Sequence, residues 1–165
     1  MKREIMKKII VVSDTHGSKK GLDSIRHLVA ENDYFIHLGD GVSDARELGA
    51  EFPEKTYVTR GNCDFFSPLP EDGELEVEWV KIYYCHGHRY GVKSERLSLA
   101  REAKKRGCQV ALYGHTHDAL ITEIDGVTLV NPGSFKRPVG EGGSYAYIVI
   151  EKDKVTPVIV GESAF

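Results

Sequence analysis

The sequence has no long hydrophobic run, few cysteines and no excess of basic residues. No apolar run in its 165 residues approaches the roughly 18 needed to cross a bilayer, so no membrane association is expected. The apolar segment IIVV near the start ends at Ser13, after four residues, and is too short for the core of a signal peptide. We therefore expect a cytoplasmic protein.

The three cysteines, Cys63, Cys85 and Cys108, make no disulfide framework, which favours a reducing compartment. The formal net charge is −3 and the basic residues are scattered, which argues against extended nucleic-acid binding but not against a small phosphate ester. With 41% hydrophobic and 28% charged residues, the chain is typical of one globular domain over residues 1–165. We expect residues 1–6 to be a disordered extension, with Met6 as an alternative native start.

Short apolar runs alternate with helical patterns through the first two thirds of the chain. The expected strands are 8–14, 34–40, 55–62, 80–88 and 109–115, and the expected helices are 20–32, 44–52 and 94–107. Ser94 is the expected N-cap of the last helix, and residues 63–73, rich in Pro and acidic residues, are expected to form a loop. Four strands follow from about residue 119, with a hairpin turn at Asp125 and Gly126. The pattern predicts an α/β fold of two sheets packed face to face with helices outside.

Five of the apolar runs end in residues that bind metals well. Together these ends supply two carboxylates, one amide and four imidazoles: Asp14, Asp40, Asn62, His16, His86, His115 and His117. Ligands of α/β proteins bind at the carboxyl ends of the strands, so we expect these side chains to share one crevice. Such donors suit divalent first-row metals, and they are too many for one tetrahedral ion. Two ions about 3.5–4 Å apart would use all seven.

The segments SDTHG, GDG, RGNCD, CHGH and GHTH, in this order between Asp14 and His117, resemble the five blocks of the calcineurin-like metallophosphoesterases. The closest resemblance is to the small bacterial and archaeal phosphodiesterases, a group related to the retromer subunit Vps29. NPGS at residues 131–134 resembles the tail motif of that group. The resemblance implies a four-layer αββα sandwich of two mixed β-sheets flanked by helices, with a binuclear metal centre at one end.

The resemblance also implies a role for each donor. Asp14, His16 and His117 would hold the first metal, Asn62, His86 and His115 would hold the second, and Asp40 would bridge both. A metal-bridging hydroxide would attack phosphorus in a small phosphodiester. The expected cofactors are two divalent ions, Mn²⁺ or Ni²⁺, with Zn²⁺, Fe²⁺ or Mg²⁺ as alternatives. Because imidazoles must be neutral to bind a metal, activity is expected to fall in acid.

The sequence departs from many relatives at Cys63, where they carry a histidine that is taken to protonate the leaving group. The candidate catalytic residues are therefore Asn62, Cys63, Asp64 and His88. Three interpretations stay open: the leaving group needs no acid, Asp64 or His88 replaces the histidine, or turnover is slow. His88, Arg89 and Arg60 are also candidates for contact with the substrate phosphate.

The enzyme hypothesis has two rivals. One is a non-catalytic interaction scaffold of the Vps29 type, which Cys63 alone favours. The other is a phosphomonoesterase or protein phosphatase, against which the short loops argue. The expected partner is a small-molecule phosphodiester substrate, and a homodimer or higher homo-oligomer is a further expectation. Phe65 and Phe66, adjacent on a loop, are expected to form a lid or a subunit contact, and His37 is expected to be a core or supporting histidine.

Overall fold

The structure is a computed structural model that describes residues 5–136 and 142–161. Its ten strands form two five-stranded mixed sheets. The first sheet has the order β10-β9-β1-β2-β3, with β1 Met6–Val12, β2 Tyr34–His37, β3 Thr56–Val58, β9 Ser144–Glu151 and β10 Lys154–Gly161. The second has the order β4-β5-β6-β8-β7, with β4 Asp72–Val77, β5 Val80–Cys85, β6 Val110–Leu112, β7 Leu120–Ile124 and β8 Val127–Asn131.

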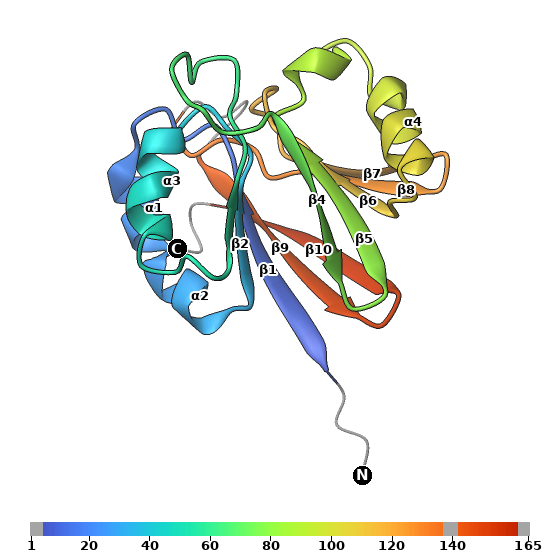
Figure 1. Ribbon diagram of the computed structural model, residues 1–165, viewed down its shortest axis with the longest axis horizontal. Helices are drawn as coiled ribbons and strands as arrows, with labels where there is room; N and C mark the ends of the chain where they lie inside the picture. The colour runs from blue at the N-terminus through green and yellow to red at the C-terminus, as the bar shows by residue number, and fades with distance from the viewer. Residues whose placement is uncertain (1–4, 137–141, 162–165) are drawn as a thin grey trace.

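Each sheet has three neighbouring parallel strands, with antiparallel pairings at one edge of the first sheet and at both edges of the second. Strands β1, β2 and β3 run parallel to one another, as do β5, β6 and β8. The antiparallel partners are β9 and β10 in the first sheet and β4 and β7 in the second. As a result, the loops that follow the parallel strands of both sheets leave from one end of the molecule (Figure 1).

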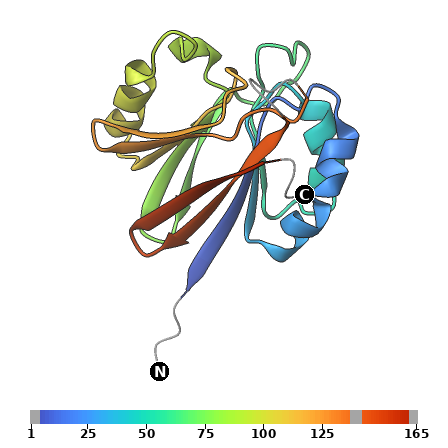
Figure 2. The same cartoon turned by 180° about the vertical axis from the view of Figure 1, so that it is seen from behind.

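The helices flank the two sheets from outside. They are α1 Lys19–Ser24, α2 Arg26–Glu31, α3 Val42–Gly49 and α4 Leu97–Lys105, with a short 3₁₀ helix, η1, at His88–Tyr90. Figure 1 shows α1, α2 and α3 beside the first sheet and α4 on the opposite flank, and Figure 2 shows the same arrangement from behind. This confirms the expected four-layer αββα sandwich. Among the described residues, no helix has the length and apolar character to cross a membrane.

Three apolar cores hold these layers together. Ile9, Val11 and Ile36 of the first sheet pack against Ile82 and Val110 of the second in the central core. In β1 and β2 alternate residues point to the other face, where a second core lies under α1, α2 and α3. A third core lies between the second sheet and α4. Strands buried on both faces explain why the apolar runs in the sequence are nearly continuous.

Two expected helices differ in the structure. The helix expected over residues 20–32 is two helices, α1 and α2, separated at Ile25. The Ser24 hydroxyl donates to the carbonyl of Gly21, and such a local bond competes with regular helix geometry. Ser94 is not the N-cap of α4, because that helix begins at Leu97 with Arg96 in the capping position. The side chain of Glu95 instead accepts hydrogen bonds from the amide and hydroxyl of Ser98.

The strand boundaries differ less. Strand β4 begins at Asp72, inside the loop expected over residues 63–73. Met6 already pairs with Glu151 in the β1–β9 ladder, so the expected disordered extension does not include it. Residues 1–4 of that extension lie outside the described residues. The predicted hairpin turn is present, with positive φ at both Asp125 and Gly126, as a two-residue turn between β7 and β8 requires.

Candidate metal centre

All seven predicted metal donors meet at the end of the molecule where the parallel strands finish. Three segments leave the first sheet, after β1, β2 and β3, and two leave the second, after β5 and β6. The donors therefore do not share the edge of one sheet. They face each other across the seam between the two sheets, where the amide of His115 donates to Asp14 Oδ2 over 3.0 Å.

The first group of donors comprises Asp14, His16 and His117. His117 Nε2 lies 3.1 Å from Asp14 Oδ1, and His16 Nε2 lies 3.7 Å from the same oxygen. The two Nε2 atoms are 3.4 Å apart. One carboxylate oxygen and two imidazole nitrogens thus converge from opposite sheets on a space of atomic size.

The second group is centred on His86. Its Nε2 atom lies 3.0 Å from Asn62 Oδ1, 3.2 Å from His115 Nδ1 and 3.3 Å from Asp40 Oδ2. The same Asp40 oxygen is 3.8 Å from His16 Nε2, which belongs to the first group. Asp40 therefore lies between the two groups, the position expected of a bridging carboxylate.

The geometry fits a pair of metal ions. Ligands about 2.1 Å from a common metal lie about 3.0 Å apart at octahedral angles and about 3.4 Å apart at tetrahedral angles, close to the separations within both groups. Asp14 Oδ1 is buried and accepts no hydrogen bond of normal geometry from the described residues, although three imidazoles surround it. An orphaned buried carboxylate oxygen is costly unless a cation binds it.

The backbone at the donors is strained. Eight non-glycine residues of the described chain have positive φ, and five of them are donors: Asp14, His16, Asp40, His115 and His117. The other three, Glu78, Asp125 and Lys152, lie in hairpin turns. Left-handed backbone is unfavourable for residues with a Cβ and concentrates at functional sites. The chain therefore folds these segments to aim side chains at a common point.

Hydrogen bonds hold several donors in place. His86 Nδ1 donates to the carbonyl of Leu38 over 2.7 Å, which leaves Nε2 as the nitrogen that faces the other donors. Ser134 Oγ donates to the carbonyl of Asp14 over 2.6 Å. Asn131 Nδ2 donates to the carbonyl of Gly114 and to Thr116 Oγ1, and so holds the loop that carries His115 and His117. The NPGS segment thus supports donors from both groups.

A buried network lies directly behind the site. His37 Nδ1 accepts from the amide of Gly39, so its Nε2–H donates to Thr15 Oγ1, and Thr15 in turn donates to Asp44 Oδ2. Burial lowers the pKa of His37 to about 4, so the ring is neutral near pH 7. The expected supporting role of His37 agrees with this position, whereas no sequence signal distinguished Asp44.

The surroundings of the donors shift their pKa values. Burial alone would raise the pKa of Asp14, but the imidazoles of His117 and His16 outweigh it, so the pKa is lowered and the carboxylate is ionised. Burial and the neighbouring His86 lower the pKa of His115 to about 4. Burial lowers the pKa of His86, but Asp40 and Asp14 outweigh it and the net shift is upward. A cation and a proton would therefore compete for His86.

The candidate proton donors differ in what they contact. Asp64 accepts backbone N–H bonds from Asp40, Gly41, Val42 and Gly61, so both of its oxygens are occupied by backbone donors. Its role is to hold two donor loops together, and its candidacy as a proton donor has no geometric support. The Sγ atom of Cys63 lies within 4.8 Å of ligand atoms of His16 and Asp40, so these three residues could hold one metal ion. Burial and the Asp40 carboxylate raise the pKa of its thiol, which stays protonated.

His88 lies beside the second group. Its ring centroid is 5.4 Å from that of His86 and 6.2 Å from that of His115. Burial lowers the pKa of His88, and its Nδ1 atom is buried with no hydrogen-bond partner among the described residues. His88 therefore remains a candidate for contact with the substrate.

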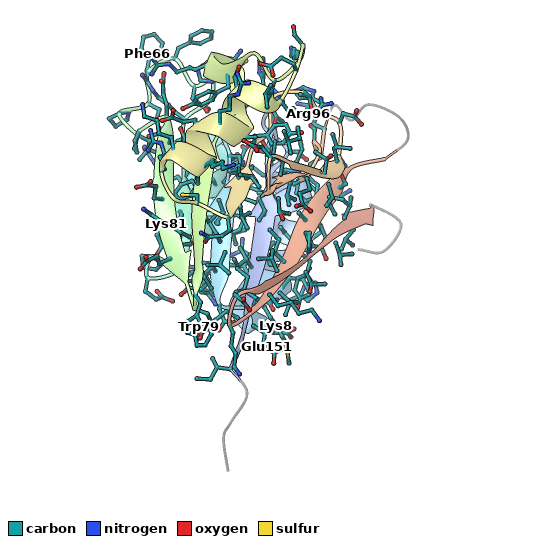
Figure 3. The ribbon with its side chains drawn as sticks, turned by 90° about the vertical axis from the view of Figure 1, so that its right-hand side faces the viewer. Lys8, Phe66, Trp79, Lys81, Arg96 and Glu151 are labelled. Atoms are coloured by element: carbon teal, nitrogen blue, oxygen red, sulfur yellow. The ribbon has the colours of Figure 1, made fainter. Side chains whose placement is uncertain are left out.

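The loop with Phe65 and Phe66 reaches solvent near the site. Phe66 is 100% exposed and Phe65 is 78% exposed. Figure 3 places Phe66 at the opposite end of the molecule from Trp79 and Glu151. Whether this loop is a lid or a subunit contact stays a prediction.

The fold and the donor arrangement together define a metal-dependent phosphoesterase of the calcineurin type. Residues 6–153 match the calcineurin-like phosphoesterase superfamily domain, and the chain belongs to this family. The expected family and the expectation of a hydrolase are both confirmed.

Individual relatives agree with this assignment. The chain is 34% identical over 151 residues to a probable metallophosphoesterase, YsnB, of Bacillus subtilis, covering 90% of this chain and 87% of that protein. It is 25% identical over 183 residues to the phosphodiesterase YfcE of Escherichia coli, covering 96% and 95%. A crystal structure of a predicted phosphoesterase from Streptococcus pneumoniae superimposes with a TM-score of 0.84 at 27% identity, covering 98% of this chain and 92% of that one.

Proposed function

We propose that the protein hydrolyses small phosphodiesters with two divalent metal ions, Mn²⁺ or Ni²⁺ in the first instance. The observation that carries the proposal is the convergence of seven donors in two groups that share Asp40. Asp14, His16 and His117 would hold one ion, and Asn62, His86 and His115 the other. The three cysteines are unpaired, which supports a cytoplasmic location.

The donor set suits an anionic substrate. Only Asp14 and Asp40 bring negative charge, so the positive charge of two divalent ions would not be cancelled. Bound there, the ions would acidify a coordinated water for attack on phosphorus and offset charge on the phosphoryl oxygens. Asn62 is exposed and contributes a neutral oxygen, so this donor adds no negative charge that would repel a diester.

The test compares metal-loaded and chelated protein on bis(p-nitrophenyl) phosphate, a chromogenic diester. We expect turnover with added Mn²⁺ or Ni²⁺ and none after chelation. Asp40→Asn removes the negative charge and one oxygen of the shared ligand, and Asp23→Asn, on an exposed helix surface, is the matched control. Activity lost in the first variant and kept in the second supports the assignment, whereas equal rates with and without metal refute it.

The identity of the proton donor calls for a second comparison. Cys63 and His88 are the two candidates that the geometry leaves. A p-nitrophenolate leaves without an acid, whereas an alkoxide needs a proton. The two variants are Cys63→Ala and His88→Asn, and one of them should lack the true proton donor. That variant should hydrolyse methyl p-nitrophenyl phosphate, from which p-nitrophenolate leaves, at nearly the wild-type rate. It should hydrolyse a dialkyl phosphate much more slowly than the wild type does. Equal slowing of both substrates would exclude the substituted residue as the donor.

The main alternative remains an interaction scaffold of the Vps29 type. A scaffold needs neither strained donors nor a buried orphan oxygen, and this chain has both. Stoichiometric binding of a protein partner without turnover of any phosphate ester would favour the scaffold.

A further inference from the structure

A second cavity lies beside the metal centre. It has a volume of about 540 Å³ and is lined by Arg60, Glu71, Tyr83, His88, Arg89 and Arg106, among others. None of the seven metal donors lines it among the residues that the structure describes. His88 separates the two sites, because its ring faces the cavity and also approaches His86 and His115. The cavity therefore adjoins the metal centre through His88.

The lining of the cavity has more positive than negative charge. Arg60 Nη2 and Arg89 Nη1 both donate to the carboxylate of Glu71, over 3.2 and 2.6 Å. One carboxylate thus fixes two guanidinium groups. Each guanidinium has five N–H donors. Within the described ranges, the bond to Glu71 is the one side-chain hydrogen bond that Arg60 makes, and the same holds for Arg89. The pair keeps unused donors and about one net positive charge.

Arg106, which also lines the cavity, differs from this pair. It donates to Glu102 over 2.9 Å and to Asp72 over 3.4 Å, and its guanidinium stacks 4.4 Å from the ring of Tyr83. Its positive charge is therefore balanced by carboxylates of the protein itself. The donors open to an incoming anion are therefore those of Arg60 and Arg89, next to His88, whose Nε2 atom lies 3.8 Å from Glu71 Oε1.

We infer that Arg60 and Arg89 bind a second anionic group of the substrate, a phosphate monoester, while the scissile diester lies at the metal donors. Guanidinium groups held by a shared carboxylate present paired N–H donors that match the oxygens of a phosphate. The inference rests on the proposed function and narrows it: the preferred substrates are diesters that carry an additional terminal phosphate, as phosphorylated nucleotides do. Arg60 and Arg89 then set specificity and do not contact the reacting phosphorus.

The test uses two substrates that differ only in that group: thymidine 5′-(p-nitrophenyl phosphate) with and without a 3′-phosphate. Wild-type protein is expected to favour the 3′-phosphorylated substrate at least about tenfold in kcat/KM, mainly through KM, as the loss of one or two charge-assisted hydrogen bonds implies. In Arg60→Gln/Arg89→Gln the ratio should fall to about one. Arg26→Gln, on α2 and outside the lining of the cavity, is the matched control and should keep the wild-type ratio.

Binding gives a result that does not need turnover. Calorimetry on metal-loaded protein compares thymidine 3′,5′-bisphosphate with thymidine 5′-monophosphate. Tighter binding of the bisphosphate, lost in the double variant, supports the inference even if no ester is hydrolysed, in which case the proposed function alone fails. Equal affinity and equal kcat/KM overturn the inference, and so does a preference that survives the double variant. Arg89→Gln alone, at a side chain that is 71% exposed, replaces the double variant if the latter does not fold.

Discussion

The carboxylate of Asp64 holds the donor loops together, and its removal has a calculable effect. Asp64 Oδ2 accepts from the amides of Asp40 and Gly61, both over 2.7 Å, and Oδ1 accepts from Gly41 and Val42, both over 3.1 Å. Asp64→Asn replaces one oxygen by an amide nitrogen, so two backbone N–H groups face a donor and not an acceptor. Each lost bond to a charged group is worth about 1.5 kcal/mol at a partly exposed site, so the free energy of unfolding should fall by about 3 kcal/mol.

The measurement is urea denaturation of chelated protein, followed by circular dichroism. Asp23→Asn, whose side chain is exposed, is the control and should change the free energy of unfolding by less than about 0.5 kcal/mol. Since Asp64 positions both Asp40 and the segment before Asn62, the same variant should also bind Mn²⁺ more weakly when metal is restored. A difference between the two variants below about 1 kcal/mol would refute the assigned role of Asp64.

Three further predictions concern single side chains. Because the pKa of His37 falls from 6.5 to about 4 on folding, the unfolded chain binds a proton first as the pH drops, and chelated protein should lose about 2 kcal/mol of stability from this residue between pH 7 and pH 5. In urea titrations at the two pH values, His37→Gln should lose correspondingly less unfolding free energy than the wild type. The control His27→Gln should show the full loss, and equal losses in the two variants would contradict the assignment. In thermal melts, Mn²⁺ should raise the Tm of wild-type protein and raise that of Asp40→Asn much less. An equal increase in Tm in both proteins would count against Asp40 as a shared ligand. Phe66→Ser should change the free energy of unfolding by less than about 0.5 kcal/mol, since the ring is fully exposed, and a loss above 1.5 kcal/mol in urea would show that the ring is covered.

The donors were predictable because each follows an apolar run. Asp14, Asp40 and His86 lie within three residues of the end of a buried strand, and the carboxyl ends of parallel strands meet at one end of a sheet. What the pattern does not show is how these strands are divided between the two sheets. That fact depends on which strands pair, and pairing is set by tertiary packing, not by periodicity.

Residues that act through backbone contacts were less predictable. Asp64 looked like a candidate acid because it is a carboxylate next to Cys63, and only the structure shows four amides around it. Glu71 lies in a segment expected to be a loop, and its two arginine partners are 11 and 18 residues away in the sequence. No local pattern records such a contact. The helix break at Ile25 was missed for a similar reason, because an apolar face continues across it.

The left-handed backbone of His115 and His117 has an evolutionary consequence. A glycine at either position would relieve about 1–2 kcal/mol of conformational strain and delete an imidazole in the same step. Selection for stability therefore favours glycine at these two positions, whereas selection for metal binding favours histidine. A lineage that no longer needed the metals would gain thermostability by losing its histidines, and in a descendant that kept only the scaffold these loops should be the first to change.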